Sequence, residues 1–227
     1  MDLKQAFAAS SVLRCATPAS LAALAPTASL RRLRKGEHLF RERDPVETIY
    51  FVASGVVSLY KLNAAGEKRV IFALGADSLV NETICDDLAA SAACEALEDS
   101  LLLCFDRRHF LLAMERDFRL TSAVFASLSK KVRRLYRQLK NASGALRGDK
   151  RIAAKLWKLA RDHGTPCGEG LRIERRISVT YLAEMLGMQR ESVSRQLKPL
   201  ADAGLVASEE GSFRIPDPDA LARYFKE

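Results

Sequence analysis

The feature that most constrains the fold is a stretch near the middle of the chain, residues 117–141, that contains neither Pro nor Gly. A stretch of this length without a helix breaker predicts one continuous helix. Within it, Leu128, Val132, Leu135 and Leu139 follow one another at spacings of four, three and four residues. Such a seam is typical of a coiled coil, and it favours a contact between two copies of the helix over a contact within one chain.

The residues before this helix predict an antiparallel β-domain. Residues 1–30 are rich in Ala, Leu and Ser and predict short helices. Glycines then separate short apolar runs, of which residues 48–53, 56–62, 69–74 and 97–105 are the clearest. Residues 63–66, Asn-Ala-Ala-Gly, predict the tip of a hairpin, and Asp106 is suited to cap a short helix at residues 109–115. Many short strands with turn signals indicate a barrel or roll.

The last third of the chain predicts a second domain. Residues 149–162 have an amphipathic helical pattern, and residues 163–170, with three Gly and one Pro, predict a loop. Residues 141–148 predict a hinge. The expected domains are therefore residues 1–116, the long helix at 117–142, and residues 149–227.

Residues 177–206 carry the strongest functional signal. Ser178 is suited to begin a helix, and Gly187 is suited to end it in a left-handed turn. A second helix is expected from about Arg190, with an inner face of Val193, Leu197, Leu200 and Ala201. Two short helices joined by a tight turn that contains Gly have the layout of a helix-turn-helix. Residues 205–207 and 212–215 then predict a wing hairpin.

The face opposite this apolar one suits DNA. Arg pairs with guanine O6 and N7, Glu accepts from cytosine N4, and Ser, Thr and Lys suit phosphates. The predicted DNA-binding residues are Ser178, Thr180, Gln189, Arg190, Glu191, Ser192, Ser194, Arg195 and Lys198. The alternative is a helical hairpin with a solvated charged face. The seam, the wing and the charge distribution argue against that alternative.

The charge of the chain is unevenly distributed. Residues 1–105 hold 11 Lys and Arg against 13 Asp and Glu, whereas residues 106–140 hold 10 against 3. An acidic front and a basic remainder suit a sensor joined to a binder of polyanions, although a solvated basic helix would give the same excess. No apolar run is long enough to span a membrane and no signal peptide is evident, so a cytoplasmic protein is expected. The five cysteines, an odd number without a CxxC pair, are expected to be free thiols.

Over residues 19–225 the chain resembles the cAMP receptor protein/FNR (Crp/Fnr) family of bacterial transcription regulators. The stretch LGMQRESVSRQLKPLADAGLV matches the family's helix-turn-helix pattern, and RKGEHLF, IYFVASGVVSLYKLNAAGEKRVIFALG and DSLVNET match its β-domain. The resemblance implies an α+β fold with a cyclic-nucleotide-binding-like antiparallel β-roll, a long dimerisation helix and a C-terminal winged helix-turn-helix. It also implies a homodimer that binds palindromic DNA half-sites containing TGA and contacts RNA polymerase. Gln189 departs from the Ser or Thr that often begins the recognition helix.

The resemblance places the effector pocket at Glu82, Thr83, Ser91, Ala92, Tyr136 and Arg137. Where the family commonly has an Arg followed by Ser or Thr for a nucleotide phosphate, this chain reads Ala90-Ser91-Ala92-Ala93. Residues 70–106 contain no Lys or Arg and eight acidic residues, so a phosphate there would lack a basic partner. We therefore expect gating by an effector other than a cyclic nucleotide, or by a redox signal. The alternatives are gating by cyclic AMP or GMP, and a regulatory subunit that does not bind DNA.

The sequence does not identify a cofactor. Only Cys15 lies near the N-terminus, so an N-terminal iron–sulfur cluster is not expected. We expect three cysteines of the β-domain to be small buried hydrophobic residues: Cys85, Cys94 and Cys104. The alternative is that they form a thiol switch or are ligands to haem or a metal. A small organic effector is equally compatible with the sequence. Motifs such as GxSxG and HExxH are missing, so no enzyme is predicted.

Overall fold

The computed structural model describes residues 1–63, 66–81, 88–142, 147–173, 177–209 and 211–226. The chain divides into two compact units, Met1–Tyr136 and Arg137–Glu227. Each unit has its own hydrophobic core. Among the helices in the described ranges, none is long and apolar enough to cross a lipid bilayer.

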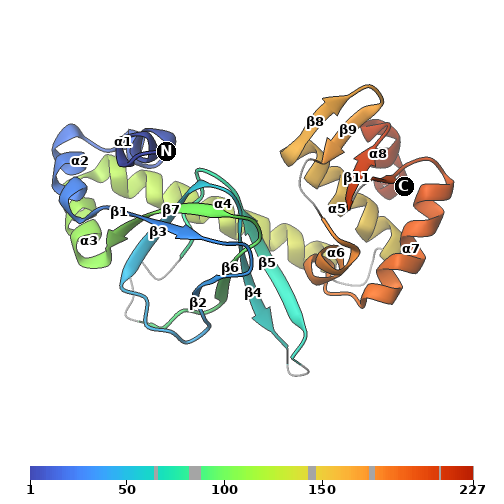
Figure 1. The fold of residues 1–227 in the computed structure, drawn as a ribbon, viewed down its shortest axis with the longest axis horizontal. Helices are drawn as coiled ribbons and strands as arrows, with labels where there is room; N and C mark the ends of the chain where they lie inside the picture. The colour runs from blue at the N-terminus through green and yellow to red at the C-terminus, as the bar shows by residue number, and fades with distance from the viewer. Residues whose placement is uncertain (64–65, 82–87, 143–146, 174–176, 210, 227) are drawn as a thin grey trace. The chain divides into compact units, whose positions relative to one another are not determined.

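The first unit combines short helices, two antiparallel sheets and most of one long helix (Figure 1). Its helices are α1 (Leu3–Ala9), η1 (Leu13–Cys15), α2 (Pro18–Leu24), η2 (Ala25–Thr27), α3 (Arg107–Arg116) and α4 (Phe118–Ala142). Its strands are β1 (Ser29–Leu33), β2 (His38–Phe40), β3 (Thr48–Ser54), β4 (Val57–Leu62), β5 (Lys68–Leu74), β6 (Ala93–Ala96) and β7 (Ser100–Asp106). The sheets have the orders β1-β7-β3 and β2-β6-β4-β5. This confirms the β-domain, the short N-terminal helices and the long helix predicted from the sequence.

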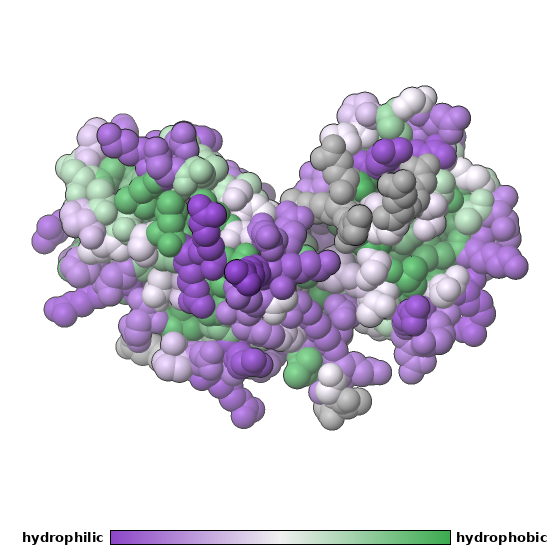
Figure 2. Space-filling model, in the orientation of Figure 1, coloured by the Kyte–Doolittle hydropathy of each residue, from purple (hydrophilic) through white to green (hydrophobic). Residues whose placement is uncertain are grey.

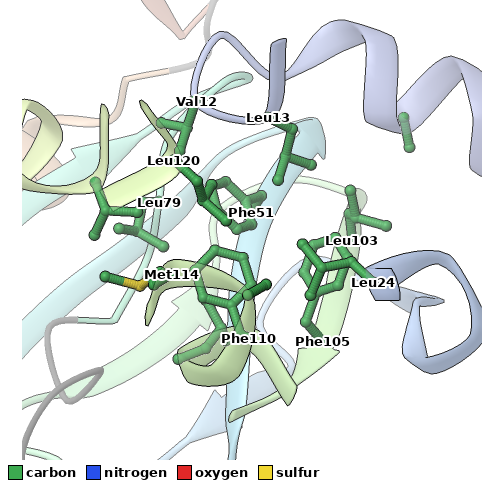
Figure 3. Close-up of a cluster of buried hydrophobic side chains, with 14 of the residues drawn as sticks. Val12, Leu13, Leu24, Phe51, Leu79, Leu103, Phe105, Phe110, Met114 and Leu120 are labelled. Atoms are coloured by element: carbon green, nitrogen blue, oxygen red, sulfur yellow. The ribbon is translucent and has the colours of Figure 1, made fainter. Parts of the chain in front are cut away.

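Strands β3 and β7 are buried on both faces because they lie between two hydrophobic clusters. Phe51, Leu103 and Phe105 face the N-terminal helices and α3, whereas Val52 and Leu102 face the interior of the roll. Figure 3 shows Phe51, Phe105 and Phe110 in mutual contact, with ring centroids 5.5–5.9 Å apart. A strand covered on both faces reads as a continuous apolar run, which is the pattern that made β3 easy to predict.

The turns of the first unit follow local chemistry. The β4–β5 hairpin is confirmed, with Leu62 opposite Lys68, and Gly66 has a φ of 76°; residues 64–65 at its tip lie outside the described residues. The Asp106 carboxylate accepts the His109 N–H at 2.9 Å and caps α3, which begins two residues earlier than predicted. The apolar run at residues 97–105 becomes strand only from Ser100, because β6 and a tight connection precede it.

Asp117 joins the N-terminal helices to the start of α4. Its carboxylate accepts the Thr17 N–H at 2.6 Å and the Arg119 and Leu120 N–H groups at 3.0 and 3.3 Å. The Thr17 hydrogen bond is the largest of the causes that hold the pKa of this buried carboxyl well below its ordinary value. The charged form of Asp117 is therefore the form that the fold stabilises.

We expect Asp117→Asn to lower the melting temperature at neutral pH, because the charged acceptor is lost. Since the carboxyl pKa is lower in the folded than in the unfolded state, its contribution is present above the unfolded value and is lost as the pH falls. The difference between variant and parent should therefore narrow below about pH 4. Thermal unfolding followed by circular dichroism measures this. Asp202→Asn, at an exposed position, is the matched control, and an equal effect of both changes would contradict the prediction.

The second unit contains α5 (Gly148–His163), β8 (Gly164–Cys167), β9 (Gly170–Ile173), α6 (Val179–Leu186), α7 (Arg190–Asp202), β10 (Ala207–Glu209), β11 (Ser212–Ile215) and α8 (Pro218–Lys226). The strands form one sheet in the order β10-β11-β9-β8. The predicted loop at residues 163–170 is wrong, because most of it forms β8 and the turn into β9. Pairing of β9 with β11 stabilises this hairpin, and Pro166 is tolerated because β8 is an edge strand.

Candidate nucleic-acid interface

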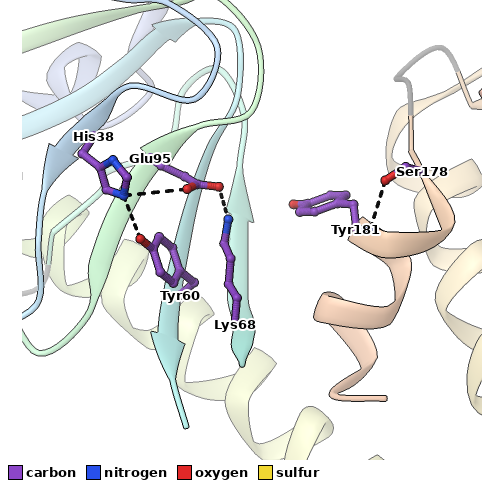
Figure 4. Close-up of polar contacts among 6 residues, drawn as sticks. All are labelled: His38, Tyr60, Lys68, Glu95, Ser178 and Tyr181. Carbon is purple, nitrogen blue, oxygen red and sulfur yellow. Dashed lines mark hydrogen bonds and ion pairs between the residues drawn. The ribbon is translucent and has the colours of Figure 1, made fainter. Parts of the chain in front are cut away.

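Helix α6 begins and ends at the two residues that the sequence indicates. The Ser178 hydroxyl accepts the Tyr181 N–H at 3.0 Å and caps the helix, as Figure 4 shows. At the other end Gly187 adopts φ 61° and ψ 44°, and the Met188 N–H donates to Ala183. A side chain at Gly187 would be strained in this left-handed conformation, so glycine suits the turn between the two helices.

Helix α7 is fixed by its inner face. Val193 and Leu200 are fully buried in the cluster that also contains Ile152 and Leu156 of α5. Leu197 is half-buried against this cluster, whereas Ala201 is exposed, so its predicted place on the inner face is wrong. The four-residue spacing from Leu197 put Ala201 on the inner face, but spacing does not show which edge of the helix is covered, and Ala201 is exposed.

The opposite face of α7 is polar and exposed. The exposed residues at the start of α7 and along this face are Gln189, Arg190, Glu191, Ser194, Arg195 and Lys198, whereas Ser192 is half-buried. Ser178, just before α6, and Thr180, on α6, are also exposed. Gln189 precedes the helix without capping it through its side chain. Within the described parts of the chain, no ion-pair partner lies beside Arg190, Arg195 or Lys198. These cations are therefore available to an anionic ligand.

The predicted wing is present and belongs to a larger sheet. Strands β10 and β11 pair with Ala207 opposite Arg214 and Ser208 opposite Phe213. Pairing starts at Ala207, so the first strand lies two residues later than the sequence indicated. Within the second unit, α5 and α8 pack together: the Tyr224 hydroxyl donates to Asp149 at 2.6 Å, and the Trp157 and Phe225 rings lie 5.9 Å apart.

Helix α4 carries an exposed apolar stripe. Val132, Leu135 and Leu139 are 43%, 36% and 66% exposed, and Leu128 is half-buried. Phe118 and Phe125, 83% and 56% exposed, extend the seven-residue spacing of Val132 and Leu139 toward the start of the helix. Neither phenylalanine was predicted from the sequence, although the same spacing identifies them.

The predicted effector residues are only partly described. Glu82, Thr83 and Cys85 lie outside the described residues. Ser91, Tyr136 and Arg137 are exposed, and Ala92 is buried. Two cations of α4 contact the sensor: the Lys131 ammonium donates to the Val80 carbonyl at 2.8 Å, and the Arg134 guanidinium lies 5.2 Å over the Phe72 ring. Neither cation was predicted from the sequence, because no local pattern distinguishes them from the other basic residues of α4.

The described cysteines of the β-domain are buried among apolar side chains. Cys94 and Cys104 are 0% and 5% exposed, and burial raises the pKa of the Cys104 thiol to about 11. A thiol with so high a pKa is almost entirely protonated at neutral pH. Across the described residues, no group of three or more His, Cys, Asp and Glu side chains is placed to hold a metal ion.

A polar cluster ties four strands of the sensor sheet together (Figure 4). His38 Nε2 shares a hydrogen bond of 2.8 Å with the Tyr60 hydroxyl and lies 3.9 Å from Glu95. Lys68 forms an ion pair with the same carboxylate and lies 4.4 Å over the Tyr60 ring. Each residue comes from a different strand, so the cluster fixes β2, β4, β5 and β6 side by side.

Comparison with known proteins gives the same two parts. The cyclic nucleotide-binding domain family matches residues 30–117, and the Crp-like helix-turn-helix domain family matches residues 150–224. The cyclic AMP receptor protein of Thermus thermophilus is 30% identical over 188 residues, which cover 82% of this chain and 83% of that protein.

Two solved structures have the same fold. FixK2 from Bradyrhizobium japonicum superposes with a TM-score of 0.76 at 21% identity, covering 86% of this chain and 96% of that one. The c-di-GMP responsive regulator CLP of Xanthomonas campestris gives 0.78 at 20% identity, covering 88% and 100%. The two family matches and the Thermus relative together show that the chain belongs to the Crp/Fnr family of DNA-binding transcription regulators, which are not enzymes.

Proposed function

We propose that the chain acts as a homodimer that reads palindromic DNA with α7 in the major groove and is gated by an effector other than a cyclic nucleotide. The observation that carries the proposal is the exposed polar face of α7, backed by the buried Val193 and Leu200. A recognition helix needs such a rigid inner face, because base-edge contacts tolerate little displacement.

Each polar residue has a proposed role. Arg190, Glu191, Ser194 and Arg195 meet base edges, because the N-terminal part of a recognition helix enters the groove first. Gln189, which makes no cap, is free to read a base. Thr180, Ser192 and Lys198 contact phosphates. Ser178 already accepts the Tyr181 N–H, so what it offers a phosphate is its hydroxyl hydrogen.

The stripe on α4 supplies the proposed dimer contact. Large apolar side chains at seven-residue spacing are costly to leave in water, and pairing two helices along them buries them. Two-fold symmetric helix-turn-helix dimers read half-sites one helical turn apart, about 34–36 Å, and we expect that spacing for this operator. The chain segment at β8 and the turn into β9 falls where the family resemblance puts a contact with RNA polymerase.

The effector that we propose is a small organic molecule. Burial of Cys94 and Cys104 argues against these thiols as a redox switch or as thiolate ligands. Phe40, Tyr50 and Phe72 are buried in the interior of the roll, which favours an apolar or aromatic ligand. Lys131 and Arg134 already contact the Val80 carbonyl and the Phe72 ring, so the ligand that we propose is uncharged.

Selection of bound duplexes from a random pool tests the reading of DNA. The purified protein is assayed with and without metabolites from a cell extract. We expect it to enrich palindromic duplexes whose TGA-containing half-sites lie about ten base pairs apart, measured from centre to centre. An electrophoretic shift on the enriched duplex, with scrambled duplex as competitor, measures the preference. If no duplex were enriched under either condition, the proposal would be contradicted, and the alternative of a regulatory subunit that does not bind DNA would be favoured.

Calorimetric titration tests the exclusion of cyclic nucleotides. We expect no heat of binding from cyclic AMP or cyclic GMP at micromolar concentrations, because residues 70–106 offer no basic side chain to the phosphate. Saturable micromolar binding of either nucleotide would overturn this part of the proposal. In that case Arg134→Ala, compared with Arg133→Ala on the exposed side of α4, would tell whether the helix supplies the missing charge.

A further inference from the structure

An apolar groove opens on the surface of the first unit between α1, η1 and α2. Its volume is about 460 Å³, which is in the range of small-molecule sites. Leu3, Phe7, Leu13 and Leu21 line it, and of these only Leu13 is fully buried. Figure 2 shows hydrophobic residues reaching the surface in the region of α1 and α2, between hydrophilic ones. The groove therefore presents half-buried hydrocarbon to solvent.

The walls of the groove are fixed to the core. A capping box between Asp2 and Gln5 begins α1, and the Phe7 ring makes an edge contact of 5.4 Å with Phe105. The Ser11 N–H donates to Asp77 at 2.5 Å, and the Thr17 N–H donates to Asp117. Because these two hydrogen bonds hold the chain on both sides of η1, and Phe7 holds α1 to the core, the groove is preformed, and a ligand would lose little affinity in ordering it.

The rim of the groove is positively charged. Lys4 and Arg14 line it and are exposed, and Arg14 Nη1 donates to the Ala8 carbonyl at 2.9 Å, which holds the guanidinium beside the end of α1. Among the described residues that line the groove none is acidic, and no ion-pair partner lies beside either cation. An apolar floor with a cationic rim is complementary to an amphiphile with an anionic head.

We propose that this groove binds a linear aliphatic carboxylate, with its chain along Phe7, Leu13 and Leu21 and its carboxylate between Lys4 and Arg14. As far as the structure describes the chain, the groove is lined only by residues of the first 25 positions and shares none with the roll interior or with α7, so the inference does not depend on the effector or the DNA contacts proposed above. A small ligand suits the limited volume of the groove, and the absence of binding by every carboxylate would overturn the proposal in favour of an acidic amphipathic peptide.

Calorimetric titration with octanoate, decanoate and dodecanoate, each below its micelle concentration, tests the site. If the chain is buried, each added methylene should raise the affinity about fourfold, so each step of two methylenes should raise it roughly fifteenfold. Decanol should bind about two- to fivefold more weakly than decanoate, because a rim ion pair in contact with solvent contributes modestly. Decyltrimethylammonium should bind more weakly still.

Matched variants locate the binding. Ala22→Phe fills the groove and should abolish binding of dodecanoate, whereas Ala23→Phe, exposed on the same helix but outside the lining, should leave it unchanged. Arg14→Gln should weaken dodecanoate binding two- to fivefold, with Arg119→Gln as its neutral control. Circular dichroism confirms that each variant is folded. Equal binding by the two phenylalanine variants, affinity independent of chain length, or no heat with any carboxylate would overturn the proposal.

Discussion

Val132→Glu is expected to convert the proposed dimer into a monomer and to lower the affinity for a palindromic operator by about two to four orders of magnitude. Val132 is 43% exposed in the single chain and occupies the middle of the apolar stripe on α4. In a pair of helices, two such carboxylates would face each other across an apolar seam, where burying two like charges is costly. A monomer then binds each half-site independently, which removes the gain from linked binding.

Sedimentation or light scattering measures the mass, and anisotropy with full and half operators measures the affinity. Ala126→Glu is the matched control, because it adds the same charge at an exposed position of α4 away from the stripe. We expect this control to remain dimeric. A Val132→Glu protein that stays dimeric and keeps its operator affinity would show that the stripe serves another contact.

Arg195→Ala is expected to remove most of the discrimination between operator and random DNA. One bidentate contact between Arg and guanine contributes about 1–3 kcal/mol, and a dimer loses it twice, so the operator affinity should fall roughly 30-fold or more. Binding to random DNA should change little, because that binding depends on phosphate contacts. Arg195 is exposed on α7 within one turn of the buried Val193, so truncation should leave the fold intact.

Lys198→Ala is the informative comparison. As a proposed phosphate contact, it should weaken operator and random DNA alike and reduce the slope of log affinity against log salt by about one per subunit. Salt titrations of the two variants, side by side, separate base reading from charge. If both variants lost affinity uniformly for all duplexes, Arg195 would be a phosphate contact and the base-reading role would pass to Arg190 or Gln189.

The helix-turn-helix was predictable because its signals are local. A Ser at an N-cap, a Gly in a left-handed turn and buried side chains at helical spacing act within a few residues of one another, so Ser178, Gly187 and Val193 have the roles that the sequence indicates. The same holds for Asp106 at the start of α3 and for the uninterrupted helix α4. Ala201 shows the limit of this reasoning, because helical spacing cannot tell which edge of a helix its neighbours cover.

By itself, then, the sequence determined the succession of β-domain, long helix and helix-turn-helix, the polar face of α7 and the apolar stripe of α4, since each depends on short-range spacing and caps. The tertiary structure decided what depends on residues far apart in the chain. Strand β8 and its turn exist because β9 pairs with β11, and Lys131 and Arg134 reach the sensor because α4 passes its sheets. The bond from Thr17 to Asp117 and the groove beside α1 arise in the same way. Such contacts form only when a fold brings distant groups together, and no local pattern records them.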